Sequence, residues 1–566
     1  MMAGRTPEFV GLDVPLPRLA ESFGVAVRLV DDLRACARRY TGRDGYLAVS
    51  DGRYNPCPTW DPRDYDHINR VAAYLWGMEP ELDAQISANI FADQLDAQDG
   101  HLRPAFRQDQ RAIHLGQWAK YAADRFLYAA TPEHLAAHWE RAVQFVRWAF
   151  AAYDPQDSGM LDQISATATG EGGLQTFWGF FVGEPAHFPF TLSPHSKPVG
   201  VAMTLCGLLA AMARFGAAHD LPDTESIRRR AERLRRLLET DGYSERRGYY
   251  YLQRDEFQRQ WYFSLNGQCE DSRELFVTPY YADEIGADPE RARAVARVVH
   301  RVLHDCHEFP APITYPRYRW YGASPECHFH AFGMDRFLFG GCWDSPYASC
   351  VGLLATVGLL ETVVEAVGRR SEAICRDGDC LEWYYPDGTT GEHGTGATYH
   401  RDRYGISATA HIVAIVEGLF GIRPAAPGFG VVRIEPAFPF RRDAAQWAAL
   451  RARRPGTPPF AGWRHSSPNP WLDRPVGLTV TLPGGRRFAW SCCRDTHSEE
   501  IRLTGSAVGA TAQYRIPVEE ETAVVGVEQG GKPLEFALDR RMDTDFVRFA
   551  CPLDGTPATI RLRRRE

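Results

Sequence analysis

Most of the chain up to residue 422 carries apolar residues at three- and four-residue spacing, the period of an α-helix with one buried face. Stretches with this period follow one another, with loops rich in glycine, proline, aspartate and aromatic residues between them. Clear examples are residues 19–40, 80–95, 135–153, 199–219, 290–306 and 347–367. The first part of the chain is therefore predicted to be mainly helical.

The pattern changes at "RPAAPGFGVVRIEPAFPF", residues 423–440, where prolines and glycines interrupt the helical period. Short runs with alternating apolar residues then follow, including residues 477–483, 486–493, 522–529, 546–552 and 558–565. Alternation with a period of two is typical of strands that are buried on one face. We expect a helical domain over residues 1–430 and a small antiparallel β-sandwich over residues 431–566.

Composition restricts the classes of protein and of partner. The chain has 566 residues, of which 44% are hydrophobic and 24% charged, near the averages for a folded soluble protein. Its net charge of -8 gives no basic field for nucleic acid. The beginning of the chain lacks a basic segment followed by an apolar run, and no apolar stretch predicts a membrane span. We therefore expect a cytoplasmic protein that binds neither nucleic acid nor a membrane.

Chemistry is concentrated in the loops, above all in "CLEWYYPDGTTGEHG", residues 380–394. There Glu382 and Glu392 stand on either side of a Pro-Asp-Gly turn, next to three aromatic residues. Flat aromatic faces beside carboxylates suit a site that holds a sugar ring and moves a proton. A surface turn with solvated acids is the alternative interpretation. Thirteen scattered cysteines do not form the paired spacing of a zinc site, and we expect no metal and no cofactor.

Four loop segments together resemble the family 63 glycoside hydrolases and the related bacterial mannosylglycerate and glucosylglycerate hydrolases. The segments are "PTWDPRDYDH" with the downstream "QDG", "QDSGMLDQIS", "GGCWDSPY" and "EWYYPDGTTGE". The resemblance implies an (α/α)6 toroid of six helical hairpins followed by the β-sandwich. It departs from the family pattern at Asp344, where the family has arginine, and at the second segment, where one extra residue precedes Asp162.

The same resemblance implies the site residues. It suggests Asp162 as general acid and Glu382 as general base, with Asp157 and Glu171 as reserve candidates for the acid. It also assigns substrate contacts to Trp60, Asp61, Gln98, Trp343, Asp344, Tyr384 and Glu392. Turn capping, by Asp157 or Asp162, and core packing, by Trp60 or Trp343, are the structural alternatives.

An acid and a carboxylate on opposite loops match the requirement of an inverting glycosidase, in which one group protonates the leaving oxygen and the other activates water. The predicted function is hydrolysis of a short, α-linked gluco- or manno-configured glycoside, with a small carbohydrate as the partner. Two alternatives stay open. A polysaccharide lyase or sugar epimerase can occupy the same toroid, and a non-catalytic carbohydrate-binding protein can keep the aromatic loops without working acids.

Overall fold

The structure is a computed structural model, and it describes part of the chain. The described residues are 11–41, 68–77, 80–93, 95, 97–100, 115–129, 132–161, 196–251, 253–255, 273–275, 277–312, 314–315, 341–381, 383–390, 405–440, 469, 471–483, 486–519, 522–542 and 544–564.

Six helical segments in the first part of the chain form a closed circuit of contacts. Each segment contacts the next, and the last contacts the first. These segments are α2 (Ile68–Trp76), α4 (Leu115–Tyr128), α8 (Val199–Ala218), α10 (Val277–Tyr280) with η4 (Tyr281–Ile285), α14 (Asp344–Val357), and α16 (Gly405–Val413) with η7 (Ala414–Leu419). We call this set the helical ring.

Other helices alternate with the ring segments along the chain. They are α1 (Pro17–Thr41), α3 (Pro80–Ser87) with η2 (Ala88–Asp93), α5 (Pro132–Ala136), α6 (Trp139–Tyr153), α9 (Thr224–Thr240), α11 (Pro289–His300) with η5 (Arg301–Asp305), and α15 (Leu360–Asp377). The difference between the two sets follows from their sequences. In α8 almost every residue is apolar and buried, whereas α9 buries only Ile227, Ala231, Leu234 and Leu238 on one face.

Residues 347–367 were expected to carry a continuous helical period, but the chain reverses direction within them. Helix α14 ends at Val357, and α15 begins at Leu360. Gly358 joins them with φ +88°, and a Cβ atom there would lie 2.9 Å from the Arg541 carbonyl oxygen. The helix ends because glycine adopts this conformation at little cost and because the Arg541 backbone packs directly against it.

The part of the chain from residue 422 onward, together with one strand near the N-terminus, forms an 11-stranded sheet. Its strands are β1 (Gly11–Asp13), β10 (Ile422–Pro424), β11 (Val431–Ile434), β12 (Val476–Leu482), β13 (Arg486–Asp495), β14 (Glu500–Val518), β15 (Thr522–Gln529), β16 (Lys532–Pro533), β17 (Ala537–Arg541), β18 (Thr544–Asp554) and β19 (Ala558–Arg564). The long strand β14 pairs with β13 and β19 through its first half and with β18 and β11 through its second. Only the β11–β14 pair is parallel among the pairs described in this sheet.

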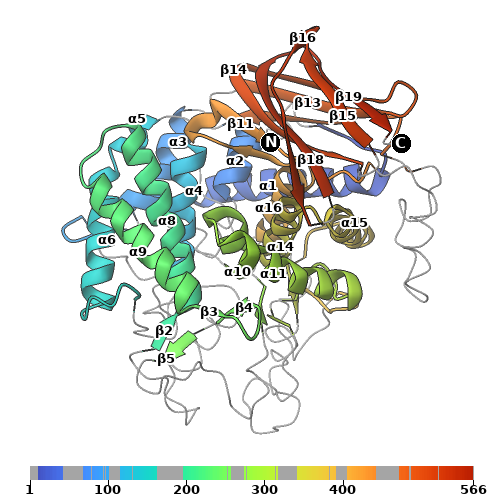
Figure 1. The fold of residues 1–566 in the computed structure, drawn as a ribbon. Coiled ribbons are helices and arrows are strands. Elements are labelled where there is room, and N and C mark those ends of the chain that lie inside the picture. Colours follow the sequence, from blue (N-terminus) through green and yellow to red (C-terminus); the bar gives the residue numbers. More distant parts are fainter. Residues whose placement is uncertain are drawn as a thin grey trace.

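The sheet covers one end of the helical ring (Figure 1). Hydrogen bonds cross the contact from Arg541 to the Thr356 carbonyl, at 2.6 Å, and from Thr544 to the Gly358 carbonyl, at 2.7 Å. One continuous cluster of buried apolar residues includes side chains from both parts. Strand β1, from the N-terminal part of the chain, is a member of the sheet. The boundary at residue 430 stays a prediction.

Helix α8 is the described helix whose length and hydropathy would suffice to cross a membrane, and 83% of its apolar window is buried inside the protein. This burial is typical of a central core helix.

Candidate active site

Short strand pairs lie beside the helical ring, and β2 to β5 are seen in Figure 1 at the end of the ring opposite the sheet. The described pairs are β2 (Ser196–Pro198) with β5 (Gln253–Asp255), β3 (Tyr243–Ser244) with β4 (Tyr249–Tyr250), β6 (Arg273–Glu274) with β7 (Thr314–Tyr315), and β8 (Cys342–Trp343) with β9 (Trp383–Tyr384). Strands β2, β6 and β8 come immediately before α8, α10 and α14. Ring helices therefore begin at this end, and their N-terminal partial positive charges favour nearby carboxylates.

The β8–β9 pair brings two of the predicted motifs together. Cys342 lies opposite Tyr384 and Trp343 lies opposite Trp383, although about 40 residues of chain separate the two strands. The segment "GGCWDSPY" and the segment "EWYYPDG" are thus direct neighbours. Glu382 and Glu392 lie outside the described residues.

Hydrogen bonds fix the backbone next to Glu382. The Leu381 carbonyl accepts from Ser407 Oγ at 2.7 Å and from an Arg370 Nη at 3.3 Å. On the other side, Tyr384 is fully buried, and its hydroxyl donates to Asp377 at 3.0 Å. The Arg370 guanidinium lies 4.4 Å from the Tyr384 ring centroid. Tyr384 thus packs beneath the loop, and its predicted substrate contact stays a prediction.

The Pro-Asp-Gly turn closes a tight hairpin. The Tyr385 N–H donates to the Thr389 carbonyl at 2.9 Å, and the Gly388 N–H donates to the Tyr385 carbonyl at 2.8 Å. Gly388 has φ +82°, and a Cβ there would lie 2.7 Å from the Phe309 ring. The Phe309 N–H in turn donates to the Pro386 carbonyl at 2.7 Å. Both the conformation and the close approach require glycine at this position.

The turn that leads to Asp162 is organised by Asp154. Its carboxylate accepts from the Ser158 N–H, the Ser158 hydroxyl and the Gly159 N–H, each at 2.7 Å. Within this turn Asp157 is 78% exposed and bonds to Arg233 at 2.8 Å. Asp162 and Glu171 lie outside the described residues, as do Trp60 and Asp61.

The remaining predicted residues are placed as follows. Gln98 is exposed in a turn, residues 97–99. Trp343 lies in β8 and Asp344 opens α14, and their backbones are described while their side chains are not.

A buried ionic network, which the sequence analysis did not anticipate, links four segments of the ring region. Arg70 donates to Asp124 at 2.8 and 3.0 Å, to Glu284 at 2.6 and 2.8 Å, and to Glu417 at 2.8 Å. The hydroxyls of Tyr74 and Tyr128 also donate to Glu417, at 2.9 and 2.7 Å. We call these six residues the Arg70 network. Its sequence signal is a charge on an otherwise apolar face, as at Arg70 in "INRVAAYLW".

The pKa shifts of two carboxyl groups in the Arg70 network have opposite directions. Burial raises the pKa of Asp124 to about 6, although Arg70 acts in the opposite direction. Burial also acts to raise the pKa of Glu284, but the Arg70 guanidinium outweighs it and the pKa falls to about 2. One buried cation therefore compensates several acids.

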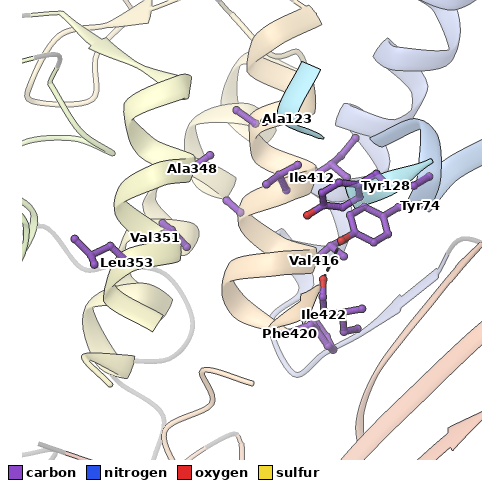
Figure 2. Close-up of a cluster of buried hydrophobic side chains, with 14 of the residues drawn as sticks. Tyr74, Ala123, Tyr128, Ala348, Val351, Leu353, Ile412, Val416, Phe420 and Ile422 are labelled. Carbon is purple, nitrogen blue, oxygen red and sulfur yellow. Dashed lines mark hydrogen bonds between the residues drawn. The ribbon is translucent and has the colours of Figure 1, made fainter. Parts of the chain in front are cut away.

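Figure 2 shows the two tyrosines of the network among buried apolar side chains. The Tyr74 and Tyr128 rings lie beside Ile412 and Val416, and a dashed line marks the hydrogen bond from Tyr74 to the Ile422 carbonyl, at 2.9 Å. The Phe429 ring packs against both, with centroid distances of 5.9 and 5.7 Å. The network thus has a structural position beneath the sheet.

His300, His304 and Asp305 form a group of metal-ligand type among the described residues, with ligand atoms within 4.8 Å of one another. The two imidazole rings are stacked at 4.5 Å. Each ring bonds to α15 through Nδ1, His300 with Thr362 at 2.8 Å and His304 with Glu365 at 2.9 Å. The histidine pair therefore connects the end of α11 and the π-helical segment η5 to α15.

Comparison of the sequence finds no matching protein family and no matching curated protein. Comparison of structures finds glycoside hydrolases. A family 78 rhamnosidase of a Bacillus species superposes with a TM-score of 0.57 at 13% identity, over 90% of this chain and 43% of that one. An α-L-rhamnosidase of Streptomyces avermitilis gives 0.53 at 12% identity, over 98% of this chain and 42% of that one. A family 63 mannosylglycerate hydrolase of Thermus thermophilus gives 0.49 at 14% identity, over 69% and 99%.

The predicted resemblance in fold to helical glycoside hydrolases is thereby confirmed. This chain spans about two fifths of the length of the rhamnosidase chains.

Proposed function

We propose that the chain is a glycoside hydrolase whose active site lies at the end of the helical ring opposite the sheet. The observation that carries the proposal is the β8–β9 pair, which joins two of the aromatic and acidic motifs at the end where ring helices begin. The fold shared with the rhamnosidases supports the same class of reaction. The ring helices are, in this proposal, the inner layer of an (α/α)6 toroid.

Glu382 is proposed as the general base. Its two neighbours in the chain are anchored, Leu381 through its carbonyl and Trp383 through the strand pair. A base that activates water gains from such preorganisation, because misplacement of the carboxylate slows the reaction.

Asp162 is proposed as the general acid in preference to Asp157. A general acid must stay protonated near neutral pH, which burial promotes. Asp157 instead forms a largely exposed ion pair with Arg233. Asp162 directly follows the buried residues Met160 and Leu161.

The substrate proposed is a short α-glycoside, hydrolysed with inversion. The sequence resemblance suggests gluco- or manno-configured sugars, and the structural neighbours add α-L-rhamnosides to the set worth testing.

Proton NMR of the protein with α-glucosides, α-mannosides, α-L-rhamnosides, trehalose and glycerate glycosides tests the reaction. The glycone is expected to be released first as the β-anomer, and trehalose should release one β- and one α-glucose. The expected effect of Glu382→Gln and Asp162→Asn is loss of turnover with an unchanged circular dichroism spectrum, while Asp157→Asn serves as the matched control and stays active. A first product with the α-anomer would exclude inversion. Saturable binding without release of sugar would contradict the hydrolase proposal and favour a binding protein. An unsaturated product that absorbs in the ultraviolet would contradict it and favour a lyase.

A further inference from the structure

A cavity of about 530 Å³ opens on the sheet. The sheet and strands β2 to β5 of the candidate active site lie at opposite ends of the helical part (Figure 1). Its walls come from β11, β14, β17 and β18 and from the loop before β17. This volume lies within the range of sites that hold small organic ligands, about 300–1,000 Å³. We call it the sheet cavity.

Strand register gathers arginines in the sheet cavity. Arg515 and Arg548 lie directly opposite each other in the antiparallel β14–β18 pair. Arg433 lies opposite Gln513 in the neighbouring β11–β14 pair, one side-chain alternation from Arg515. Like charges directly opposite each other on one face destabilise a sheet unless something neutralises them. Arg541 completes the set that lines the cavity.

Acidic side chains neutralise this set only in part. Four arginines line the cavity, with two glutamates, Glu435 and Glu535. Glu435 forms an ion pair with Arg515 and lies 3.8 Å from Arg433. Within the described part of the chain, no carboxylate forms an ion pair with Arg548.

Arg541 has contacts of its own, but its pKa is also affected by the neighbouring arginines. Its Nε lies 3.3 Å from Asp539, and one Nη donates to the Thr356 carbonyl. Burial lowers the pKa of Arg541, and the charges of Arg433 and Arg548 lower it further, while Asp283 acts in the opposite direction. The guanidinium groups therefore repel one another across the cavity, and a bound anion would relieve that repulsion.

The rest of the lining is suited to a sugar ring. Phe536, which is 38% exposed, presents an aromatic surface at the cavity. Gln513 and Glu535 supply amide and carboxylate groups for hydroxyls. Arginine forks bind carboxylates through paired hydrogen bonds.

We propose that the sheet cavity binds an acidic sugar, of the uronate class, with its carboxylate against Arg548 and Arg433 and its ring against Phe536. This site is separate from the proposed active site and does not depend on the hydrolase proposal.

Isothermal titration calorimetry at low salt tests the proposal with three probes: glucuronate, glucose and inorganic phosphate. Glucuronate is expected to bind at millimolar concentration or below, more tightly than phosphate, while glucose gives no heat. Arg548→Gln removes a charge-assisted contact and should weaken glucuronate binding about tenfold or more. Phe536→Ala should weaken glucuronate binding while leaving phosphate unaffected.

Arg502→Gln is the matched control, because Arg502 lies on β14 like Arg515 but outside the cavity, with Glu500 as its partner at 3.0 Å. It should leave the affinity unchanged. Three results would overturn the proposal: no binding of glucuronate, equal binding of phosphate and glucuronate, or equal losses in Arg548→Gln and Arg502→Gln.

Discussion

Replacing Arg70 by methionine tests whether the Arg70 network holds the ring region together. Methionine keeps most of the side-chain length but leaves Asp124, Glu284 and Glu417 without their shared cation. Breaking a buried ion pair by removing one partner costs about 3–5 kcal/mol in the free energy of unfolding. For a cooperative unit of about 430 residues, a loss of about 4 kcal/mol lowers the melting temperature by about 4 °C.

The loss should depend on pH. In the wild type, the lowered pKa of Glu284, about 2, contributes stability that is present above about pH 4.5 and is lost as the pH falls toward 2. Without Arg70 that contribution disappears, and the buried acids take up protons more readily. The difference in unfolding free energy between wild type and variant should therefore be largest near pH 8 and shrink toward pH 5.

Urea denaturation followed by circular dichroism at pH 8 and pH 5 measures both effects. Arg228→Met is the matched control, because Arg228 also pairs with two acids, Glu225 and Glu232, but its side chain is 55% exposed. Its loss should stay below about 1 kcal/mol, as for exposed pairs. Equal losses in the two variants at pH 8, or a loss in Arg70→Met that does not change with pH, would refute the reasoning.

Three further predictions concern single positions. Gly388→Ala should lower stability by about 1–2 kcal/mol and reduce turnover. Gly378→Ala, at a helix end with φ +72° and open space around it, should leave turnover unchanged. Equal losses of turnover in the two variants would show that the Gly388 hairpin does not support the active site. Asp154→Ala removes the acceptor for two backbone N–H groups before Asp162 and should cost about 1–2 kcal/mol by thermal unfolding; wild-type stability would contradict this. Burial, aided by Arg370, lowers the pKa of His411 well below its usual value, so the unfolded chain alone binds a proton as the pH falls below about 6.5. His411→Asn should therefore flatten the loss of stability between pH 7 and pH 5 in urea titrations, and an unchanged slope would rule out this role.

Sequence patterns were sufficient to predict the helical first part and the strand-rich second part. Helix and strand periods follow from local geometry, since a buried face recurs every three to four residues or every two. The order of the loop motifs indicated a likeness in fold to helical glycoside hydrolases, and the comparison of structures confirms that likeness. The prediction failed locally at Gly358, where the apolar spacing continues across a chain reversal.

Only the tertiary structure decided which distant residues meet. The pairing of Trp343 with Trp383 depends on two strands that are far apart in the chain, and no local pattern specifies such a pair. The Arg70 network needs helical segments from four parts of the chain. Arg70 finds its ionic partners on other segments, so its own helix does not predict them.

The arginines of the sheet cavity illustrate the same limit. In sequence, Arg515 and Arg548 are ordinary, exposed-looking positions on separate strands, and only the register of β14 against β18 sets them face to face. Local sequence determines which elements form, because its periods act over a few residues. Charged side chains find their partners only when distant segments pack together in the folded protein, because electrostatic interactions act through space.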